Sequence, residues 1–257
     1  MRRNILITGA SAGLGRGMAW EFARRERNLA LCARRIDLLN ELREQLLAAH
    51  PSIKVAIQQL DVTNHDRVFK VFNGFSDDLG GIDRVIVNAG SSGGRPLGTA
   101  SFVVNKHTAE TNFVAALAQC EAALELFRAR QAGHLVMISS MSALRGFPKN
   151  LTTYAATKAG VLALAEGIRA DTLATPIRVS TILPGYIRSE TNTAVPAARL
   201  IVGTDRGCHL LAKAIEREPA RACVPAWPWG LFGVGMRLLP LRVVSRFGGA
   251  AQQARGV

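Results

Sequence analysis

Short apolar runs alternate with longer amphipathic segments along residues 1–185. The apolar runs are continuous, which is typical of parallel strands that are buried on both faces. This rhythm predicts an α/β fold, a doubly wound Rossmann-type parallel sheet of about seven strands with helices on both faces. The predicted strands cover residues 4–8, 29–33, 53–62, 85–87, 135–138, 177–183 and 222–224, and the predicted helices cover 14–27, 38–49, 66–79, 106–130, 152–174 and 207–218.

The rhythm weakens after Pro184-Gly185, but no linker, repeat or charge run divides the chain. We therefore predict a single domain over 1–257, in which 1–185 form the cofactor-binding and catalytic core. Residues 186–220 are expected to form a substrate loop or lid and a helix. Residues 221–257 are expected to form a short last strand and an apolar-basic tail. That tail has three interpretations: a core-packing helix, a dimer or substrate-pocket element, or a membrane-surface anchor.

The charge balance narrows the classes of function. The 32 Lys and Arg residues exceed the 19 Asp and Glu residues and give a formal charge of +13. The cations are scattered and only 6% of residues are aromatic, whereas nucleic-acid sites usually concentrate cations in one block with aromatic residues between them. We therefore expect a solvated basic surface and no nucleic-acid partner.

The four cysteines and five histidines give no sign of a metal site, because none has the spacing of zinc ligands. The cysteines are expected to be small buried hydrophobes in a reducing compartment. A basic start at Arg2-Arg3 leads into an apolar run that breaks at Thr8-Gly9, so no secretion signal is expected. We predict a cytoplasmic protein.

A glycine-rich loop, TGASAGLG, follows the first predicted strand and opens the first predicted helix. Its glycines allow a tight turn and a close approach of the backbone to a diphosphate, and the helix N-terminus supplies N–H donors. The position at the first strand–helix junction favours a nucleotide site over an ordinary turn. The loop residues predicted to bind the cofactor are Gly9, Ser11, Ala12, Gly13, Leu14 and Gly15.

The second predicted strand ends at Ala33-Arg34-Arg35. An acidic residue there would bind the adenosine ribose hydroxyls of NAD(H). Arg34 can instead meet a 2′-phosphate and stack on adenine, which favours NADP(H). The alternative is a solvated arginine pair that opens the next helix.

Two further strand ends carry polar residues. Asp61-Val62 closes the third predicted strand, where the carboxylate could accept from the adenine amino group. Asn88, Ala89 and Gly90 close the fourth, where a small residue lets a cofactor approach. Each motif alone is also typical of a capped turn.

Tyr154 and Lys158 lie four residues apart in an otherwise apolar helix, so the phenol and the ammonium share one face. An adjacent cation favours the phenolate and would lower the pKa of Tyr154, which makes it a usable acid–base group. An ordinary helical Tyr–Lys pair is the alternative. Ser139-Ser140 favour catalysis, because they end the fifth predicted strand at the carboxyl edge, where open α/β sheets bind ligands.

Taken together, these motifs resemble the short-chain dehydrogenase/reductase family, in its compact single-domain branch. The resemblance runs in order from Asn4 to about Thr191. Each motif is weak alone, whereas the ordered set is specific. It comprises TGxxxGxG at 8–15, Asp61, NAG at 88–90, Ser140, YxxxK at 154–158 and Pro184-Gly185.

The resemblance implies a role for each matching residue. Tyr154 would be the general acid/base, Lys158 would lower its pKa and hold the nicotinamide ribose, and Ser140 would stabilise the developing oxyanion. Asn112 would hold a water in a proton relay. The interval from Ser140 to Tyr154 is one residue longer than is usual in the family, so Ser139 and Ser142 stay open as alternatives. Ile187 and Ser189 match family positions that orient the nicotinamide carboxamide, and the preceding Pro184 and Gly185 are also expected to bind the cofactor.

We therefore expect an NADP(H)-dependent oxidoreductase that interconverts a carbonyl and a secondary alcohol. The apolar 186–205 segment and tail suggest a lipophilic substrate such as a ketoacyl, steroid-like or other lipid. A homodimer or homotetramer is expected, and peripheral membrane contact through the C-terminal tail is a further hypothesis. Two alternatives remain from other classes: a non-catalytic NADPH-binding scaffold on the same fold, and a basic membrane-surface or nucleic-acid-associated protein.

Overall fold

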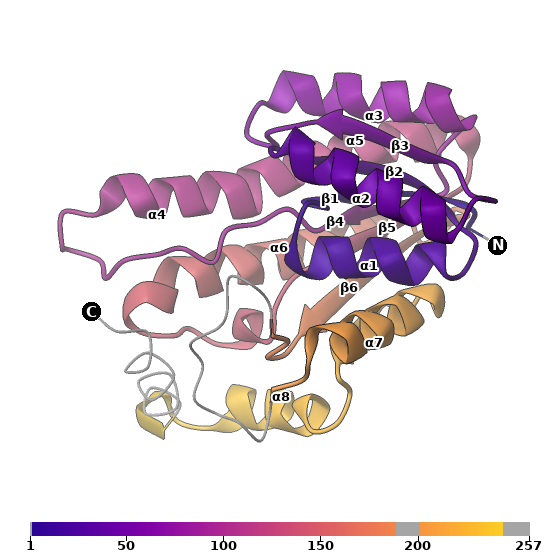
Figure 1. Cartoon of the computed structure of the whole chain (residues 1–257). Helices are drawn as coiled ribbons and strands as arrows, with labels where there is room; N and C mark the ends of the chain where they lie inside the picture. Colours follow the sequence, from indigo (N-terminus) through magenta and orange to yellow (C-terminus); the bar gives the residue numbers. More distant parts are fainter. Residues whose placement is uncertain (1, 189–200, 244–257) are drawn as a thin grey trace.

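The structure, a computed structural model, describes residues 2–188 and 201–243. Its seven strands form one sheet in the order β3-β2-β1-β4-β5-β6-β7, and every neighbouring pair is parallel (Figure 1). The fold class predicted from the sequence is confirmed. The strands are β1 (Asn4–Thr8), β2 (Asn28–Ala33), β3 (Val55–Gln59), β4 (Arg84–Val87), β5 (Gly133–Ile138), β6 (Ile177–Pro184) and β7 (Arg221–Val224).

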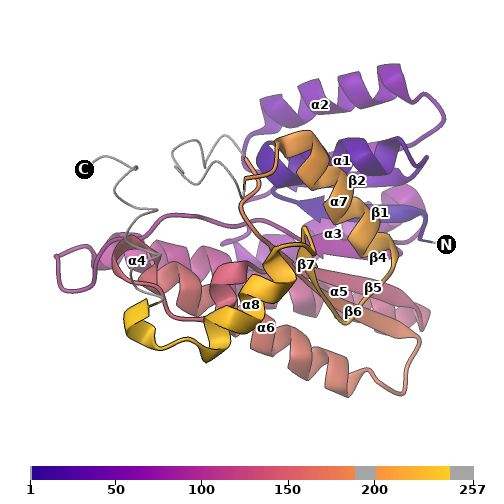
Figure 2. The ribbon, with the colours of Figure 1, turned by 90° about the horizontal axis from the view of Figure 1, so that it is seen from below.

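Helices cover both faces of the sheet, as Figure 1 and Figure 2 show from two directions. Alternate residues of a strand point to opposite faces. In β1, Ile5 and Ile7 join the cluster under α1, α2 and α7, whereas Leu6 joins the cluster under α3, α5 and α6. The helices are α1 (Gly13–Ala23), α2 (Ile36–Ala49), α3 (His65–Leu79), α4 (Phe102–Ala109), α5 (Ala115–Arg130), α6 (Thr152–Asp171), α7 (Thr204–Glu216) and α8 (Trp229–Leu238).

The strand order reverses between β1 and β4, because the chain builds β2 and β3 on one side of β1 and the later strands on the other. The chain therefore leaves β1 and β4 toward opposite halves of the sheet. In open α/β sheets, ligands bind at such a point.

The structure corrects the predicted end of the third strand. The sequence predicted a strand over 53–62, but β3 ends at Gln59. Asp61 Oδ1 accepts hydrogen bonds from the Thr63 backbone N–H (3.0 Å) and from Thr63 Oγ1 (2.8 Å). This local turn takes the chain out of the sheet.

The single helix predicted over 106–130 is also corrected. Helical structure begins at Phe102, and a π-turn, η1 (Glu110–Val114), separates α4 from α5. A π-turn is uncommon and is often found at functional sites. Here it carries Asn112, whose side chain bonds the backbone of Ser91.

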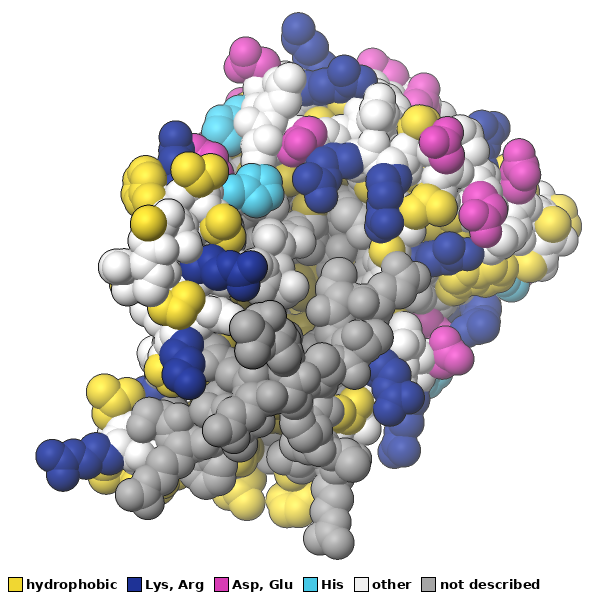
Figure 3. Space-filling view, turned by 60° about the vertical axis from the view of Figure 1, so that its left-hand side comes forward, with side chains coloured by type: hydrophobic (Ala, Val, Ile, Leu, Met, Phe, Trp, Pro, Cys, Tyr) yellow, Lys and Arg dark blue, Asp and Glu magenta, His cyan; other side chains and the backbone are white. Residues whose placement is uncertain are grey.

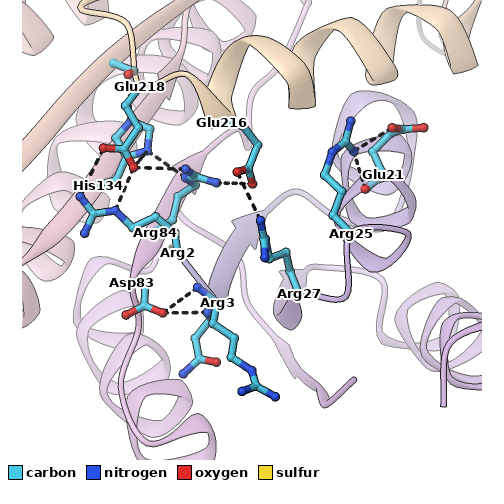
Figure 4. A network of polar contacts seen from close by, with 12 residues as sticks. Arg2, Arg3, Glu21, Arg25, Arg27, Asp83, Arg84, His134, Glu216 and Glu218 are labelled. Atoms are coloured by element: carbon cyan, nitrogen blue, oxygen red, sulfur yellow. Dashed lines mark hydrogen bonds and ion pairs between the residues drawn. The ribbon is translucent and has the colours of Figure 1, made fainter. Parts of the chain in front are cut away.

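A network of charged side chains lies at the opposite, amino edge of the sheet (Figure 4). Arg84 is 1% exposed and donates to His134 Nδ1 (2.8 Å), to Glu216 Oε1 (2.9 Å) and to Glu218 Oε1 (3.3 Å). His134 Nε2 lies 2.8 Å from Ser180 Oγ. Glu216 ends α7 and Glu218 follows it, so these ion pairs hold the end of α7 against Arg84, the first residue of β4.

Candidate active site

The glycine-rich loop lies against the loop after β4. Gly9 has a φ of +66°, and a Cβ there would lie 2.9 Å from Ala89 Cα. A Cβ on Gly15 would overlap the carbonyl oxygen of Gly9. Gly13 also has a positive φ of 54° and is the first residue of α1, with Ala12 as its N-cap. The loop therefore leaves backbone N–H groups at a helix N-terminus open to a diphosphate, and the residues present fit such a group.

Thr8 and Asn88 join the loop after β1 to the loop after β4. Thr8 Oγ1 accepts from the backbone N–H groups of Asn88 (3.0 Å) and Ala89 (3.1 Å). Asn88 Nδ2 donates to the Thr8 carbonyl (2.8 Å). The side chain of Asn88 thus supports the loop, and Thr8 is a supporting residue that the sequence analysis had not singled out. The remaining loop residue, Leu14, packs against the core below.

The end of β2 brings an arginine to the glycine-rich loop, but it is Arg35. Its guanidinium donates to Ser11 Oγ from Nε (3.3 Å) and from Nη2 (3.2 Å). Arg34 is exposed, and its carbonyl accepts from Gln59 Nε2 (2.9 Å). Sequence reasoning selected only Arg34, although the neighbouring Arg35 was visible in the same motif.

Asp61 and Val62 lie just beyond β3. Burial alone would raise the pKa of Asp61, but hydrogen bonds from Thr63 and the positive charge of Arg34 outweigh it and hold the pKa below its usual value. Asp61 is therefore an anion near Arg34. Val62 is buried in the core beneath.

Lys158 is buried beside Tyr154 on α6. Its Nζ donates to the carbonyl of Ile138, the last residue of β5 (3.0 Å), and lies 6.0 Å from the centre of the Tyr154 ring. Burial lowers the pKa of Lys158 to about 8. The helix thus brings the phenol and the ammonium together as the sequence spacing predicted.

Asn112, in the π-turn η1, lies close to Lys158. Its Oδ1 accepts from the Ser91 N–H (2.7 Å), and its Nδ2 donates to the Ser91 carbonyl (2.8 Å) and Thr157 Oγ1 (3.3 Å). A Cβ on Gly90 would lie 3.1 Å from Asn112 Oδ1 and 3.6 Å from Lys158 Nζ. Gly90, Asn112 and Lys158 therefore converge where the loop after β4 meets α6.

The three candidate serines after β5 have different surroundings. Ser139 is 3% exposed, and its Oγ donates to the Lys158 carbonyl (2.8 Å). Ser140 is partly exposed, and its Oγ accepts from the Ser142 N–H (3.1 Å), which leaves its own hydroxyl hydrogen for another acceptor. Ser142 supplies its backbone to that bond. Ser140 is therefore the serine best placed to donate to a ligand.

The end of β6 meets α8. Pro184 ends the strand, and a Cβ on Gly185 would overlap the indole of Trp229. Ile187 is buried and pairs with Val202, whose N–H donates to the Tyr186 carbonyl (3.0 Å). Trp229 is a residue that sequence reasoning did not assign. Its indole N–H is buried and has no hydrogen-bond partner among the described residues. Ser189 lies outside the described residues.

Two absences apply within the described ranges 2–188 and 201–243. No cluster of three or more His, Cys, Asp or Glu side chains there is arranged to hold a metal ion. No helix in that part of the chain combines the length and apolar character needed to span a membrane.

The fold and site thus define a doubly wound α/β protein with a glycine-rich loop after β1 and with Ser140, Tyr154, Lys158 and Asn112 at the same edge of the sheet. The chain belongs to the short chain dehydrogenase family, whose sequence pattern matches residues 3–200. It is an oxidoreductase of that family.

Relatives match nearly the whole chain. An uncharacterised oxidoreductase of Mycobacterium tuberculosis is 52% identical over 246 residues, which cover 96% of this chain and 97% of the relative. An uncharacterised oxidoreductase of Myxococcus xanthus is 33% identical, with 98% of each chain covered. Among solved structures, a short-chain dehydrogenase from Streptomyces avermitilis has a TM-score of 0.76 at 26% identity and covers 96% of this chain and 99% of its own. ElxO, solved with NADP bound, has a TM-score of 0.74 at 25% identity, with 85% and 91% covered.

Proposed function

We propose that this protein is an NADP(H)-dependent oxidoreductase that interconverts a carbonyl and a secondary alcohol on a lipophilic substrate. The observation that carries the proposal is the buried Lys158 ammonium beside the Tyr154 ring, at the carboxyl edge of the sheet. A bound NADPH would supply the hydride. A non-catalytic scaffold would gain nothing from desolvating an ammonium at this place.

The proton that the carbonyl oxygen gains during reduction is transferred by a side chain of the protein. We assign Tyr154 as the group that gives a proton to the carbonyl oxygen during reduction and takes it back in the reverse direction. Lys158 holds positive charge next to the phenol, and Ser140 donates a hydrogen bond to the same oxygen as negative charge develops. Asn112, fixed by Ser91 and Thr157, positions the loop that borders Lys158.

The preference for NADP(H) is supported by charge at the end of β2. Arg34 and Arg35 follow Ala33, so no carboxylate stands where the ribose hydroxyls of NAD(H) would need one. The Arg35 guanidinium reaches the glycine-rich loop at Ser11. Two cations at that corner favour a 2′-phosphate. ElxO offers a precedent for NADP among similar structures.

The lipophilic substrate is supported by an apolar wall next to Ser140. Met141, Leu183, Trp229 and Met236 form a buried cluster, with Leu144, Phe147, Leu162, Tyr186, Cys223 and Phe232 packed against it. Ligand sites are lined mostly by apolar side chains, so an apolar cluster beside Ser140 favours an apolar substrate.

The catalytic assignment is tested by Tyr154→Phe. Loss of the hydroxyl should reduce kcat for a ketone or alcohol substrate by about 10²–10⁴-fold, while the dissociation constant for NADPH, measured by fluorescence, should stay the same. Near-normal turnover in this variant would contradict the assignment. Unchanged NADPH binding separates loss of chemistry from loss of the fold.

The cofactor assignment is tested by Arg34→Ala and Arg35→Ala. Removing a charge-assisted contact to phosphate should weaken NADPH binding by about 10–100-fold and leave NADH binding nearly unchanged. Arg43→Ala is the matched control, because Arg43 is exposed on the same helix, α2, away from the glycine-rich loop. Equal weakening of NADPH and NADH would contradict an NADP preference.

A further inference from the structure

Several segments at the carboxyl edge of the sheet contain no acidic residue. Asp61 and Asp66 follow β3, whereas the segments 88–109, 139–165 and 225–243 contain no Asp or Glu. These acid-free segments follow β4, β5 and β7. The exposed cations that they and the segment after β6 carry include Arg95, Lys149, Arg188 and Arg237.

The same segments expose large apolar side chains. On α8, Leu231, Val234 and Leu238 recur at three- and four-residue spacing, so they share one helix face, and Leu238 is 79% exposed. The opposite face of α8 holds the buried Trp229 and Met236. Further large apolar side chains exposed along these segments are Leu97, Phe102, Val103, Trp227 and Leu241.

In Figure 1, α4 lies above the start of α6 and projects to the left of the sheet, and α8 lies below the start of α6. Figure 3 brings this side forward. Its described lower left shows dark-blue and yellow side chains, whereas magenta acidic side chains lie in the upper and right-hand parts. Residues 88–109, 139–151 and 225–243 are called the carboxyl-edge rim below.

We propose that the carboxyl-edge rim docks on an anionic lipid surface. Each cation near such a surface is attracted to the lipid head groups, and this attraction falls off within a Debye length. The exposed face of α8 and the tip of α4 supply the apolar side chains that enter the head-group region. Trp227, exposed just before α8, is the residue type that prefers the boundary between water and lipid.

Other occupants fit the rim less well. A second copy bound through a two-fold interface would bring this surface against itself, and so set cations against cations with no acidic residue in the rim to neutralise them. A small soluble anion would be attracted by the charge but would gain nothing from exposed Leu238, Phe102 and Trp227. Only a partner that is both anionic and apolar uses both features.

Docking through the rim would turn the Ser140 end of β5 toward lipid. The buried face of α8 packs on Met141 and Leu183, which adjoin Ser140 and the end of β6. A lipophilic substrate could then enter from the lipid surface. This consequence rests on the proposed function, whereas the docking itself does not.

The docking is tested by sedimentation of the full chain, saturated with NADPH, with vesicles of phosphatidylcholine containing about a third phosphatidylglycerol. We expect binding to these vesicles and weak binding to phosphatidylcholine alone. Leu238→Glu should weaken binding by about tenfold or more, since it removes an inserted apolar group and adds a repelled charge. Its matched control, Leu173→Glu, alters a leucine that is 76% exposed outside the rim and should leave binding unchanged.

A second pair of variants tests how much the basic residues of the rim contribute to vesicle binding. Arg237→Gln should weaken binding by about fivefold, and Arg178→Gln, which alters an exposed arginine of β6 outside the rim, should not. The tryptophan emission of the wild type should shift to shorter wavelength on binding, and this shift should be lost in Trp227→Phe.

The proposal is overturned if the chain does not bind the anionic vesicles at about 0.15 M salt, or if Leu173→Glu weakens binding as much as Leu238→Glu. It is also overturned if Leu238→Glu lowers the oligomeric state measured by light scattering, because a second copy would then cover the rim. None of these measurements uses turnover, so failure of the docking and failure of the proposed reaction are distinguishable.

Discussion

Two buried cations at opposite edges of one sheet are held in contrasting ways. Arg84, at the amino edge, is 1% exposed and meets two carboxylates and the His134 ring. Lys158, at the carboxyl edge, is 6% exposed and donates to the carbonyl of Ile138. Among the described residues, no carboxylate forms a salt bridge with Lys158.

The difference separates a cation that fixes structure from one that is available for chemistry. Burial lowers the pKa of Arg84, but Glu216 and Glu218 oppose the shift and keep the guanidinium compensated. Burial lowers the pKa of Lys158 to about 8 with no acidic residue to oppose it. Such uncompensated desolvation is costly for folding and is often found at functional sites.

The largest expected effect is that of Lys158→Met. Loss of the cation beside Tyr154 should lower kcat by about 10³-fold. The same change should raise the free energy of unfolding of the cofactor-free protein at pH 7 by about 1–3 kcal/mol, because a desolvated charge is removed from the core. Steady-state kinetics and urea denaturation measure the two effects. A variant that is both inactive and destabilised would contradict this interpretation of Lys158.

The pH dependence of that gain follows from the sign of the shift. Between a folded pKa of about 8 and the ordinary value of 10.5, the unfolded wild type binds more protons than the folded protein. The wild type therefore becomes more stable as the pH rises through this window. Below about pH 8 the buried Lys158 ammonium destabilises the folded protein to its full extent. The advantage of Lys158→Met should accordingly shrink above pH 8.

Arg84→Met should lower the free energy of unfolding, whereas Lys158→Met should raise it. Removing this guanidinium leaves Glu216, Glu218 and the His134 ring without their shared partner, and loss of one member of a buried ion network costs about 3–5 kcal/mol of unfolding free energy. Arg130→Met is the matched control, because Arg130 pairs with Asp83 at the same edge but is more exposed. It should cost less than about 1 kcal/mol. Equal losses in thermal or urea unfolding would show that burial is not decisive.

These two edges also show what the sequence could and could not predict. The seven parallel strands and the family followed from apolar runs and from motifs whose spacing is local, such as Tyr154 and Lys158 on one helix. A four-residue spacing fixes which side chains meet, whatever the rest of the chain does. The positions of Tyr154 and Lys158 were therefore accessible before the structure.

Contacts between segments far apart in the chain were not accessible. Arg84 and Glu216 are separated by 132 positions, and nothing local distinguishes them from the other arginines and glutamates. Asn112 in the π-turn bonds Ser91, which is 21 positions away, and the approach of Arg35 to Ser11 accompanies the packing of α2 beside β2 and β3. Such details require tertiary geometry, and the sequence analysis consequently selected Arg34 alone.

His134 should make the amino edge sensitive to acid. Burial, followed by the charge of Arg84, lowers the pKa of His134 from 6.5 to about 3. Between these values the unfolded chain binds more protons, so stability is fully present above pH 6.5 and is lost as the pH falls toward 3. From pH 7 to pH 5 this one group should remove about 2 kcal/mol.

Urea titrations at the two pH values measure this loss. His134→Gln should flatten that part of the profile, and His65→Gln, at an exposed histidine that begins α3, should leave it unchanged. If the acid slope of His134→Gln equals that of the wild type, another group is responsible.

The smallest effect is expected at Ser139, whose hydroxyl donates to the backbone of Lys158 and not to its ammonium. Ser139→Ala should lower the free energy of unfolding by about 1 kcal/mol, as expected for a buried hydrogen bond. It should change kcat by less than about fivefold, whereas Ser140→Ala should lower kcat by about 10²-fold through loss of a donor to the oxyanion. A kcat for Ser139→Ala as low as that for Ser140→Ala would reverse the assignment of the two serines. Because the carboxyl edge holds Lys158 through carbonyl and backbone contacts, it can keep the lysine in place without neutralising its charge.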